Sequence, residues 1–179
     1  MVYLFLANGF EEIEALTPLD YLRRAGVEVK TVGIGGQEIT GSHKITVVCD
    51  ITDKELDTQG CFDMVILPGG LPGADNLFAS KEVNYMLDRA EKEDKFVCAI
   101  CAAPYILGQK GMLRGKRACC YPGFEDKLEG ATVLLDGVVR DGKIITSRGM
   151  GKSVDFALEI VESLCGTEVR QKLKSATLY

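Results

Sequence analysis

Cys101 is the residue of this chain best placed to carry out chemistry. It follows the apolar run 97–100 and precedes Ala102, Ala103 and Pro104, which allow a sharp reversal into a helix. A strand followed by such a turn is a nucleophile elbow, on which the side chain projects above the sheet edge. Free amides at the helix start favour the thiolate, the nucleophilic form of cysteine. The sequence therefore predicts a cysteine nucleophile, with a structural cysteine in a strand-to-helix junction as the alternative.

Three further loops should lie beside Cys101, because each is expected to follow a parallel strand. Their sequences are NGFEEIE (8–14), PGGLPGADN (68–76) and SRGMG (147–151). In the second loop, Gly69 and Gly70 offer backbone amides that suit an oxyanion hole together with the amide of Ala102. A plain tight turn is the alternative for these glycines. In the third loop, Arg148 is a candidate accessory residue.

Glu14 is the candidate proton carrier for Cys101. Ile13 is expected to hold the first helix against the sheet, so that Glu14 reaches the crevice, whereas Glu11 and Glu12 are expected to face solvent. A hydrogen bond to a charged group contributes about 1.5–3 kcal/mol, against about 0.3–1 kcal/mol for a helix terminus. Two neighbouring anions are disfavoured in a partly dry site. We therefore expect the pair to share one proton, with the pKa of Glu14 raised and that of Cys101 lowered.

Length and composition narrow the class of protein. The 179 residues, 46% of them hydrophobic, fit one domain over 1–179. A formal net charge of -5 with scattered basic residues argues against nucleic acid as a partner. No stretch has transmembrane length, and the apolar run 2–7 is too short for a signal-peptide core. Seven cysteines, an odd number, are typical of a reducing compartment, so we predict a cytoplasmic protein without a membrane partner.

The sequence predicts neither a metal nor an organic cofactor. There is a single histidine, His43, and no pair of C-x2-C knuckles. The C-x2-C formed by Cys98 and Cys101 has its first cysteine inside a strand, unlike a thioredoxin dithiol. In GIGGQE (33–38), Glu38 occupies the third glycine position of a dinucleotide fingerprint, and no GxxxxGK[ST] phosphate loop is present. His43 lies in a polar loop, where solvent exposure or an interface contact is expected, and it is also a candidate accessory residue.

Apolar runs alternate with amphipathic segments along the chain. Strands are predicted at 2–7, 28–33, 45–49, 63–68, 117–120 and 132–135, and immediately before Cys101. Helices are predicted at 11–24, 81–93 and 153–164, and immediately after Cys101. Asp141-Gly142, between 138–140 and 143–146, predicts a small β-hairpin. This order predicts an α/β fold with a mostly parallel sheet, helices on both faces, and a site at the carboxyl ends of the strands.

Four blocks resemble the ThiJ/PfpI superfamily: LANGFEEIEALTPLDYLRRAGVEV, DMVILPGGLPGADNL, AICAAP and IITSRGMG. Within it, the chain is similar to the parkinsonism-linked glyoxalase III and protein deglycase branch. The resemblance covers nearly the whole chain and implies a flavodoxin-like three-layer sandwich, a domain like that of class I glutamine amidotransferases, and a homodimer. It also implies that the reactive cysteine falls on Cys101, its protonated partner on Glu14, and the oxyanion turn on Gly69 and Gly70.

The resemblance also implies an activity. Members are reported to convert methylglyoxal to lactate without glutathione, to reverse early glycation adducts, and to respond to oxidation at the cysteine. A glyoxalase or deglycase is therefore expected, with a small aldehyde or a glycated protein as partner. A redox sensor or chaperone that uses the same cysteine without turnover is the alternative.

Two positions depart from relatives within the superfamily. Ala102 stands where the protease-like branch has histidine, which disfavours proteolysis. Tyr121 stands where many closer relatives carry histidine, so the acid–base role falls on Glu14 and Tyr121 is at most accessory. Asp20 matches an acidic position behind that missing histidine and is expected to be structural.

Overall fold

A seven-stranded sheet forms the centre of the molecule. The structure is a computed structural model that describes residues 1–179. The strand order is β10-β11-β7-β6-β1-β2-β5, and all neighbours are parallel except β10 and β11, which are antiparallel. The strands are β1 (Val2–Leu6), β2 (Val29–Gly33), β5 (Ile51–Thr52), β6 (Met64–Leu67), β7 (Phe96–Ile100), β10 (Val138–Asp141) and β11 (Ile144–Ser147). The order of the central five strands is that of a flavodoxin-like fold.

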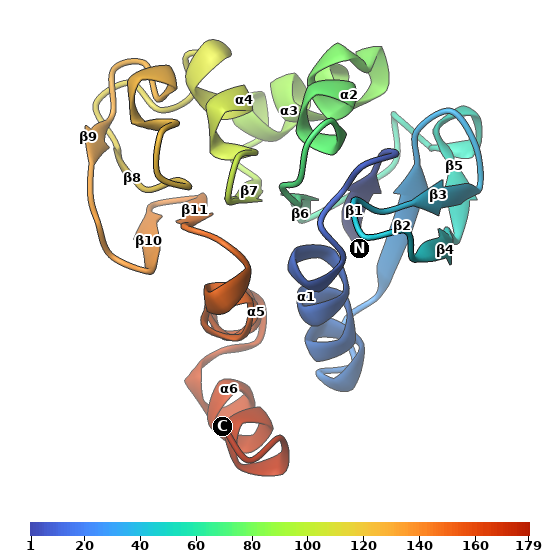
Figure 1. Ribbon diagram of the computed structural model, residues 1–179. Coiled ribbons are helices and arrows are strands. Elements are labelled where there is room, and N and C mark those ends of the chain that lie inside the picture. The colour runs from blue at the N-terminus through green and yellow to red at the C-terminus, as the bar shows by residue number, and fades with distance from the viewer.

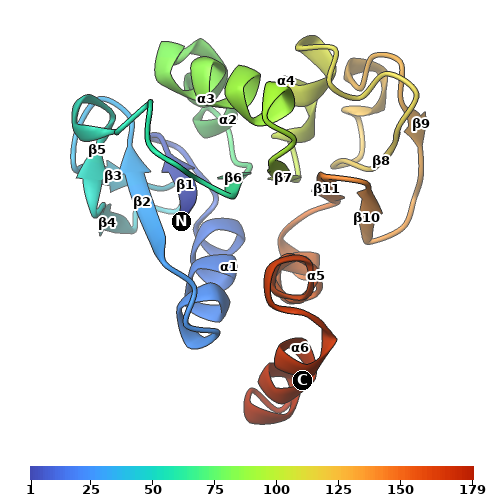
Figure 2. The same ribbon diagram turned by 180° about the vertical axis from the view of Figure 1, so that it is seen from behind.

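Helices cover both faces of this sheet (Figures 1 and 2). One face carries α2 (Gly73–Ala79), α3 (Lys81–Lys92) and α4 (Pro104–Gln109). The other carries α1 (Glu12–Arg24) and α5 (Ser153–Cys165), and α6 (Thr167–Ala176) packs on α5. Every residue of β1, β6 and β7 is buried, as expected for strands covered on both faces. None of the helices is long and apolar enough to span a bilayer.

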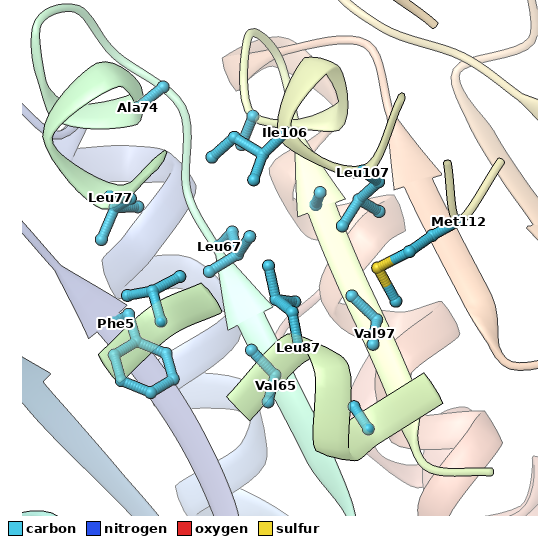
Figure 3. Packing of buried hydrophobic residues seen from close by; sticks show 14 of the residues in the cluster. Phe5, Val65, Leu67, Ala74, Leu77, Leu87, Val97, Ile106, Leu107 and Met112 are labelled. Carbon is cyan, nitrogen blue, oxygen red and sulfur yellow. The ribbon is translucent and has the colours of Figure 1, made fainter. Parts of the chain in front are cut away.

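Two hydrophobic clusters fill the spaces between the layers. In the first, Leu67 and Val65 of β6 lie against Leu87 of α3 and Ile106 of α4 (Figure 3). The second joins the opposite face of the sheet to α1 and α5. Alternate residues of each central strand belong to alternate clusters, because successive strand side chains point to opposite faces. The sheet is thereby held from both sides, and the loops at its edges have fixed starting points.

The predicted α/β sandwich is confirmed, but several element predictions change. The PGGLPGADN segment contains α2, and α6 follows the last predicted helix. The segment at 45–49 is β4 (Thr46–Val48), which pairs with β3 (Glu38–Thr40) outside the main sheet. The segments at 117–120 and 132–135 shorten to β8 (Arg117–Ala118) and β9 (Thr132–Val133), a separate parallel pair. The hairpin at 138–146 is present as β10 and β11.

Short 3-10 helices complete the chain. They are η1 (Asp53–Glu55), η2 (Glu125–Lys127) and η3 (Met150–Lys152). The last of them connects the end of β11 to α5 and passes beside the first turn of α1, where the Met150 amide approaches Glu14. This connection brings the third sequence-predicted loop to the same sheet edge as Cys101.

Candidate active site

Cys101 lies on the turn between β7 and α4, at the carboxyl end of the sheet. Its φ is 64°, in the left-handed region that costs energy for any residue with a side chain. The backbone holds this conformation from two sides. The Cys101 N–H donates to the Ser147 carbonyl at 2.9 Å, and the Tyr121 N–H donates to the Cys101 carbonyl at 2.8 Å. The side chain is half-buried, so the thiol remains reachable from the surface.

Glu14 faces this thiol from the first turn of α1. Its carboxylate is buried, and its Oε2 accepts the Gly69 N–H at 3.0 Å. Its own N–H donates to the side chain of the N-cap residue Glu11 at 2.8 Å, which fixes the first turn. Its second oxygen, Oε1, is buried without a hydrogen-bond partner in good geometry. Glu14 therefore presents one anchored oxygen and one free oxygen to the site.

Gly69 makes the close approach of Glu14 and Cys101 feasible. A Cβ added at Gly69 would lie 2.5 Å from Glu14 Oε2 and 2.7 Å from Cys101 Cβ. Real Cβ atoms do not approach other atoms so closely, so any larger residue would push the two side chains apart. Because its N–H is already donated to Glu14, Gly69 holds the carboxyl group. Gly69 was predicted to offer this N–H to an oxyanion, but in the structure the N–H is occupied by Glu14.

The candidate oxyanion-binding amides that remain are those of Gly70 and Ala102. Both face the Cys101 sulfur and act to lower its pKa. Gly70 has a φ of 85°, and a Cβ there would lie 2.4 Å from the Glu11 nitrogen. Glycine is therefore required at this position both by conformation and by space. Two convergent amides beside a sulfur can stabilise negative charge on an atom bonded to it.

The site raises the pKa of Glu14 to about 7. Burial is the main cause, and the charge of Glu11 adds to it, while contacts with the Cys101 thiol and the Gly69 and Met150 amides act in the opposite direction. The expected upward shift of Glu14 is therefore confirmed. A carboxyl group with a pKa near neutrality can both accept and donate a proton under physiological conditions.

The pKa of Cys101 differs from the sequence-based expectation. Burial and the adjacent negative charge of Glu14 raise it to about 12, and the Gly70 and Ala102 amides only partly offset this rise. The helix that follows is also short, six residues long, so its terminus contributes little. The expected low thiol pKa is thus wrong while Glu14 is ionised. With a proton on Glu14 the repelling charge would be absent, so transfer of the thiol proton to Glu14 is the route to a thiolate that this pair offers.

Glu12 does not face solvent, contrary to expectation. It is buried and reaches the loop before β4, where its Oε1 accepts the His43 N–H at 2.8 Å. Its Oε2 lies 3.0 Å from His43 Nδ1 and accepts the Ser42 hydroxyl at 3.4 Å. The ligand-type atoms of Glu11, Glu12 and His43 lie within 4.8 Å of one another. Both Glu12 oxygens are already hydrogen-bonded, so this group acts as a clamp on the loop.

The accessory candidates occupy different surroundings. Tyr121 and Glu14 both approach Gly149, because a Cβ added there would be 3.3 Å from the Tyr121 ring and 3.9 Å from Glu14 Oε1. Tyr121 therefore lies near Glu14. Arg148 instead donates to the Leu135 carbonyl at 3.2 Å and serves the loop before β10. The His43 side chain is 72% exposed, as expected for a polar loop, and contacts the Glu12 clamp. Of the three, only Tyr121 has a contact that places it beside the site.

Several contributors were not identified from the sequence. Glu11 is the N-cap of α1, and the E-x-x-E spacing to Glu14 resembles a capping box that could have indicated it. Met150 supplies an amide near Glu14 and is 52% exposed.

Two further predictions concern the outer side of α1. Ile13, which was expected to pack against the sheet, is instead 47% exposed. Asp20 forms an exposed ion pair with Arg24 at 2.6 Å, which agrees with the structural role expected for it.

Taken together, the fold and the site define a flavodoxin-like α/β protein with a cysteine on a strained strand-to-helix turn and a buried glutamic acid beside it. The model of the DJ-1/PfpI family matches residues 1–163. The chain therefore belongs to the DJ-1/PfpI family.

Named relatives agree with this assignment. The Parkinson disease protein 7 homolog of Danio rerio is 39% identical over 96% of this chain and 93% of its own. A glutathione-independent glyoxalase of Caenorhabditis elegans is 33% identical over 91% of this chain and 87% of its own. The solved structure of oxidized Toxoplasma gondii DJ-1 superposes with a TM-score of 0.95 at 32% identity, covering 99% of this chain and 97% of that one. The family thus includes glyoxalase-type enzymes.

Proposed function

We propose that this protein is a cysteine-dependent glyoxalase that converts small 2-oxoaldehydes such as methylglyoxal to 2-hydroxy acids without glutathione. The observation that carries the proposal is the buried Glu14 carboxyl, with its pKa near 7 and one free oxygen, beside the Cys101 thiol. A structural carboxylate would have both oxygens hydrogen-bonded and a low pKa. The relative named as a glutathione-independent glyoxalase supports the substrate class.

The first step forms a bond between Cys101 and the aldehyde carbon. The ionised Glu14 accepts the thiol proton as Sγ attacks, and the carbonyl electron pair moves to oxygen. The Gly70 and Ala102 amides stabilise this oxyanion until it is protonated to the hemithioacetal. Because both groups have raised pKa values, the reactive form of the pair carries one proton in total.

The second step is a proton transfer by the same carboxyl group. Glu14 removes the proton from C1 of the hemithioacetal, the electrons form an enediol, and reprotonation at C2 gives a thioester. Water then cleaves the thioester, releasing the 2-hydroxy acid and the free thiol. The overall change is addition of one water to the 2-oxoaldehyde, so no cofactor is consumed.

The test is lactate formation from methylglyoxal by the reduced protein in the absence of glutathione. Turnover should be lost in Cys101→Ala and strongly reduced in Glu14→Gln. Cys61→Ala is the matched control, because Cys61 is an exposed free cysteine in another part of the chain. Lactate formation that persists in Cys101→Ala would refute the proposal.

A redox sensor or chaperone role is the second candidate. A half-buried thiol flanked by two amides and a protonatable carboxyl group can also stabilise an oxidised cysteine. The name of the oxidized Toxoplasma gondii relative favours this candidate. It predicts that limited peroxide oxidises Cys101 before Cys61, as mass spectrometry can measure, and that the folded, reduced protein shows no turnover.

We also propose a homodimer. Ile13 and Ile45 are about half-exposed, and they line one open depression together with Leu16 and Val154. Exposed apolar residues gathered in one place are typical of an interaction surface. Sedimentation equilibrium should give twice the chain mass, and Ile13→Asp should shift the measured mass toward that of the monomer.

Glycated proteins as additional substrates and a cytoplasmic location remain predictions.

A further inference from the structure

A second chemically distinctive region lies at the opposite edge of the sheet from Cys101. An open cavity of about 460 Å³ is formed where β7 and β11 begin, with walls from the end of α3 and the loop before β8. Phe96 starts β7 on the cavity side, and Cys101 follows the end of that strand, roughly 16 Å away at about 3.3 Å per residue. The proposed catalytic chemistry uses none of the residues of this cavity.

Three lysines line the cavity, and none of them forms a direct ion pair. Lys95, Lys116 and Lys143 are all half-buried, and none has a carboxylate within 4.0 Å. Partial burial of an ammonium group is unfavourable unless a negative group offsets it. These lysines therefore supply positive charge that no direct ion pair neutralises, while Glu93 acts on Lys95 and Asp141 acts on Lys116 from beyond 4.0 Å.

The remaining charged groups do not cancel this excess. Arg140 also lines the cavity, but it is already paired with Glu159 at 3.6 Å. Glu91 and Asp94 lie on the exposed rim. The lining thus has four basic and two acidic side chains, in a chain whose net charge is -5. A local positive excess in an acidic protein attracts anions to this place.

The cavity has an apolar floor, with one aromatic residue at its edge. The Lys143 ammonium lies 4.2 Å from the centre of the ring of Phe96, a residue that packs in the cluster on the opposite face of the sheet, and this cation–π contact holds Lys143 at the edge of the cavity. The apolar floor consists of Val97, Met112 and Ile144, which belong to the hydrophobic cluster of that face. Val97 and Met112 lie next to each other in this cluster (Figure 3). A bound molecule could therefore contact both apolar surface and cations.

We propose that this cavity binds a small organic anion with a carboxylate or phosphate group on an apolar ring or chain. The three lysines would hold the anionic group, and the apolar floor would hold the rest. Combined apolar and ionic contacts in a concave site are the usual basis of small-molecule recognition. The proposal is independent of turnover at Cys101.

The test uses ¹H–¹⁵N NMR of the full chain at low salt, titrated separately with phenyl phosphate, benzoate and benzyl alcohol. Phenyl phosphate or benzoate should shift amides confined to 90–97, 112–116 and 140–144, and the tighter of the two identifies the preferred anionic group. Benzyl alcohol, which keeps the ring but lacks the charge, should bind at least tenfold more weakly. The Lys116→Gln and Lys143→Gln double variant should weaken anion binding at least tenfold.

Lys81→Gln is the matched control, because Lys81 is exposed, forms no ion pair and lies outside the cavity. It should leave anion binding unchanged. Shifts scattered over the surface, equal weakening by Lys81→Gln, or equal binding of benzyl alcohol would each overturn the proposal. Thermal unfolding checks that the double variant is folded. If the double variant is unfolded, the single variant Lys116→Gln and the positions of the shifted amides in the unmodified protein test the proposal instead.

Discussion

Glu12 and Glu14 are two buried carboxylates in the same turn of α1, and their surroundings give them opposite properties. Glu12 points to the loop before β4, and Glu14 points to Cys101. Burial disfavours ionisation of both. At Glu12, hydrogen bonds from its own first-turn amide, the His43 ring and the His43 and Ile45 amides outweigh burial and lower the pKa. At Glu14, burial prevails and the pKa rises to about 7.

The difference shows that hydrogen-bond supply decides what a buried carboxyl group does. Each Glu12 oxygen has at least one donor, so the group is a stable anion that fastens a loop. Glu14 has one donor on one oxygen and none in good geometry on the other. Its proton is therefore exchangeable near neutral pH, which is the property that acid–base catalysis needs.

The largest expected effect is on turnover, and it separates the two carboxyl groups. Glu14→Gln should lower kcat/KM for methylglyoxal by about 10²–10⁴-fold, because the proton carrier is lost. In the unmodified protein the rate should rise with pH around 7, where the Cys101–Glu14 pair loses its first proton. This rise should be absent in Glu14→Gln. Glu12→Gln should cost less than tenfold. The measurement is the pH profile of lactate formation by both variants, and similar losses would contradict the distinction.

The next effect concerns the spacing between Glu14 and Cys101. Gly69→Ala should destabilise the protein by about 1–3 kcal/mol and remove most turnover, because the new Cβ overlaps both side chains. Gly36→Ala is the control, since its Cβ would meet no atom within 4 Å and its φ is not positive. Urea unfolding and thiol alkylation rates measure the two effects. An unchanged alkylation rate in Gly69→Ala would show that Gly69 does not hold the pair.

A third effect is the opposite pH dependence of stability. The raised pKa of Glu14 means that the folded state binds more protons than the unfolded state between about 4.5 and 7. The protonated Glu14 therefore adds to the free energy of unfolding below the unfolded pKa. This contribution, about 1–3 kcal/mol, is lost as pH rises through 7. Glu14→Gln should gain stability relative to the unmodified protein between pH 5 and pH 8.

Glu12 should behave in the reverse way. Its lowered pKa means that its contribution is present above the unfolded pKa near 4.5 and is lost as pH falls through the lower folded value. Glu12→Gln should therefore destabilise the protein at pH 7 and much less at pH 3. Urea titrations of both variants across this range provide the measurement. Parallel pH curves for the two variants would refute the contrast.

The smallest effect is expected at Tyr121. The residue is 51% exposed, its hydroxyl has no hydrogen-bond partner within the chain, and its amide donates to the Cys101 carbonyl. Tyr121→Phe should change kcat/KM by about fivefold or less, since a neutral hydrogen bond contributes about 1 kcal/mol. A loss of a hundredfold or more would assign the hydroxyl a direct part in proton transfer, beside Glu14.

The sequence predicted the elements that follow a strong local pattern. Buried runs such as VCAI before Cys101 contain only apolar residues, so the strand and its turn could be identified locally. The helix at α2 was missed because its segment begins with Pro and Gly, which are typical of loops. The β4 segment was identified as a strand, but its pairing with β3 rather than the main sheet depends on chain contacts that no local pattern contains.

The sequence by itself determined the candidate residues for the proposed chemistry, while the tertiary structure decided their burial and the direction of their pKa shifts. Cys101 and Glu14 could be selected because a nucleophile elbow and a helix start have local signatures. Cys98, three residues earlier in the same strand, is fully buried, whereas Cys101 is half-buried at the strand exit. The pKa directions required the full set of neighbours, because desolvation and hydrogen bonds come from segments far apart in the chain.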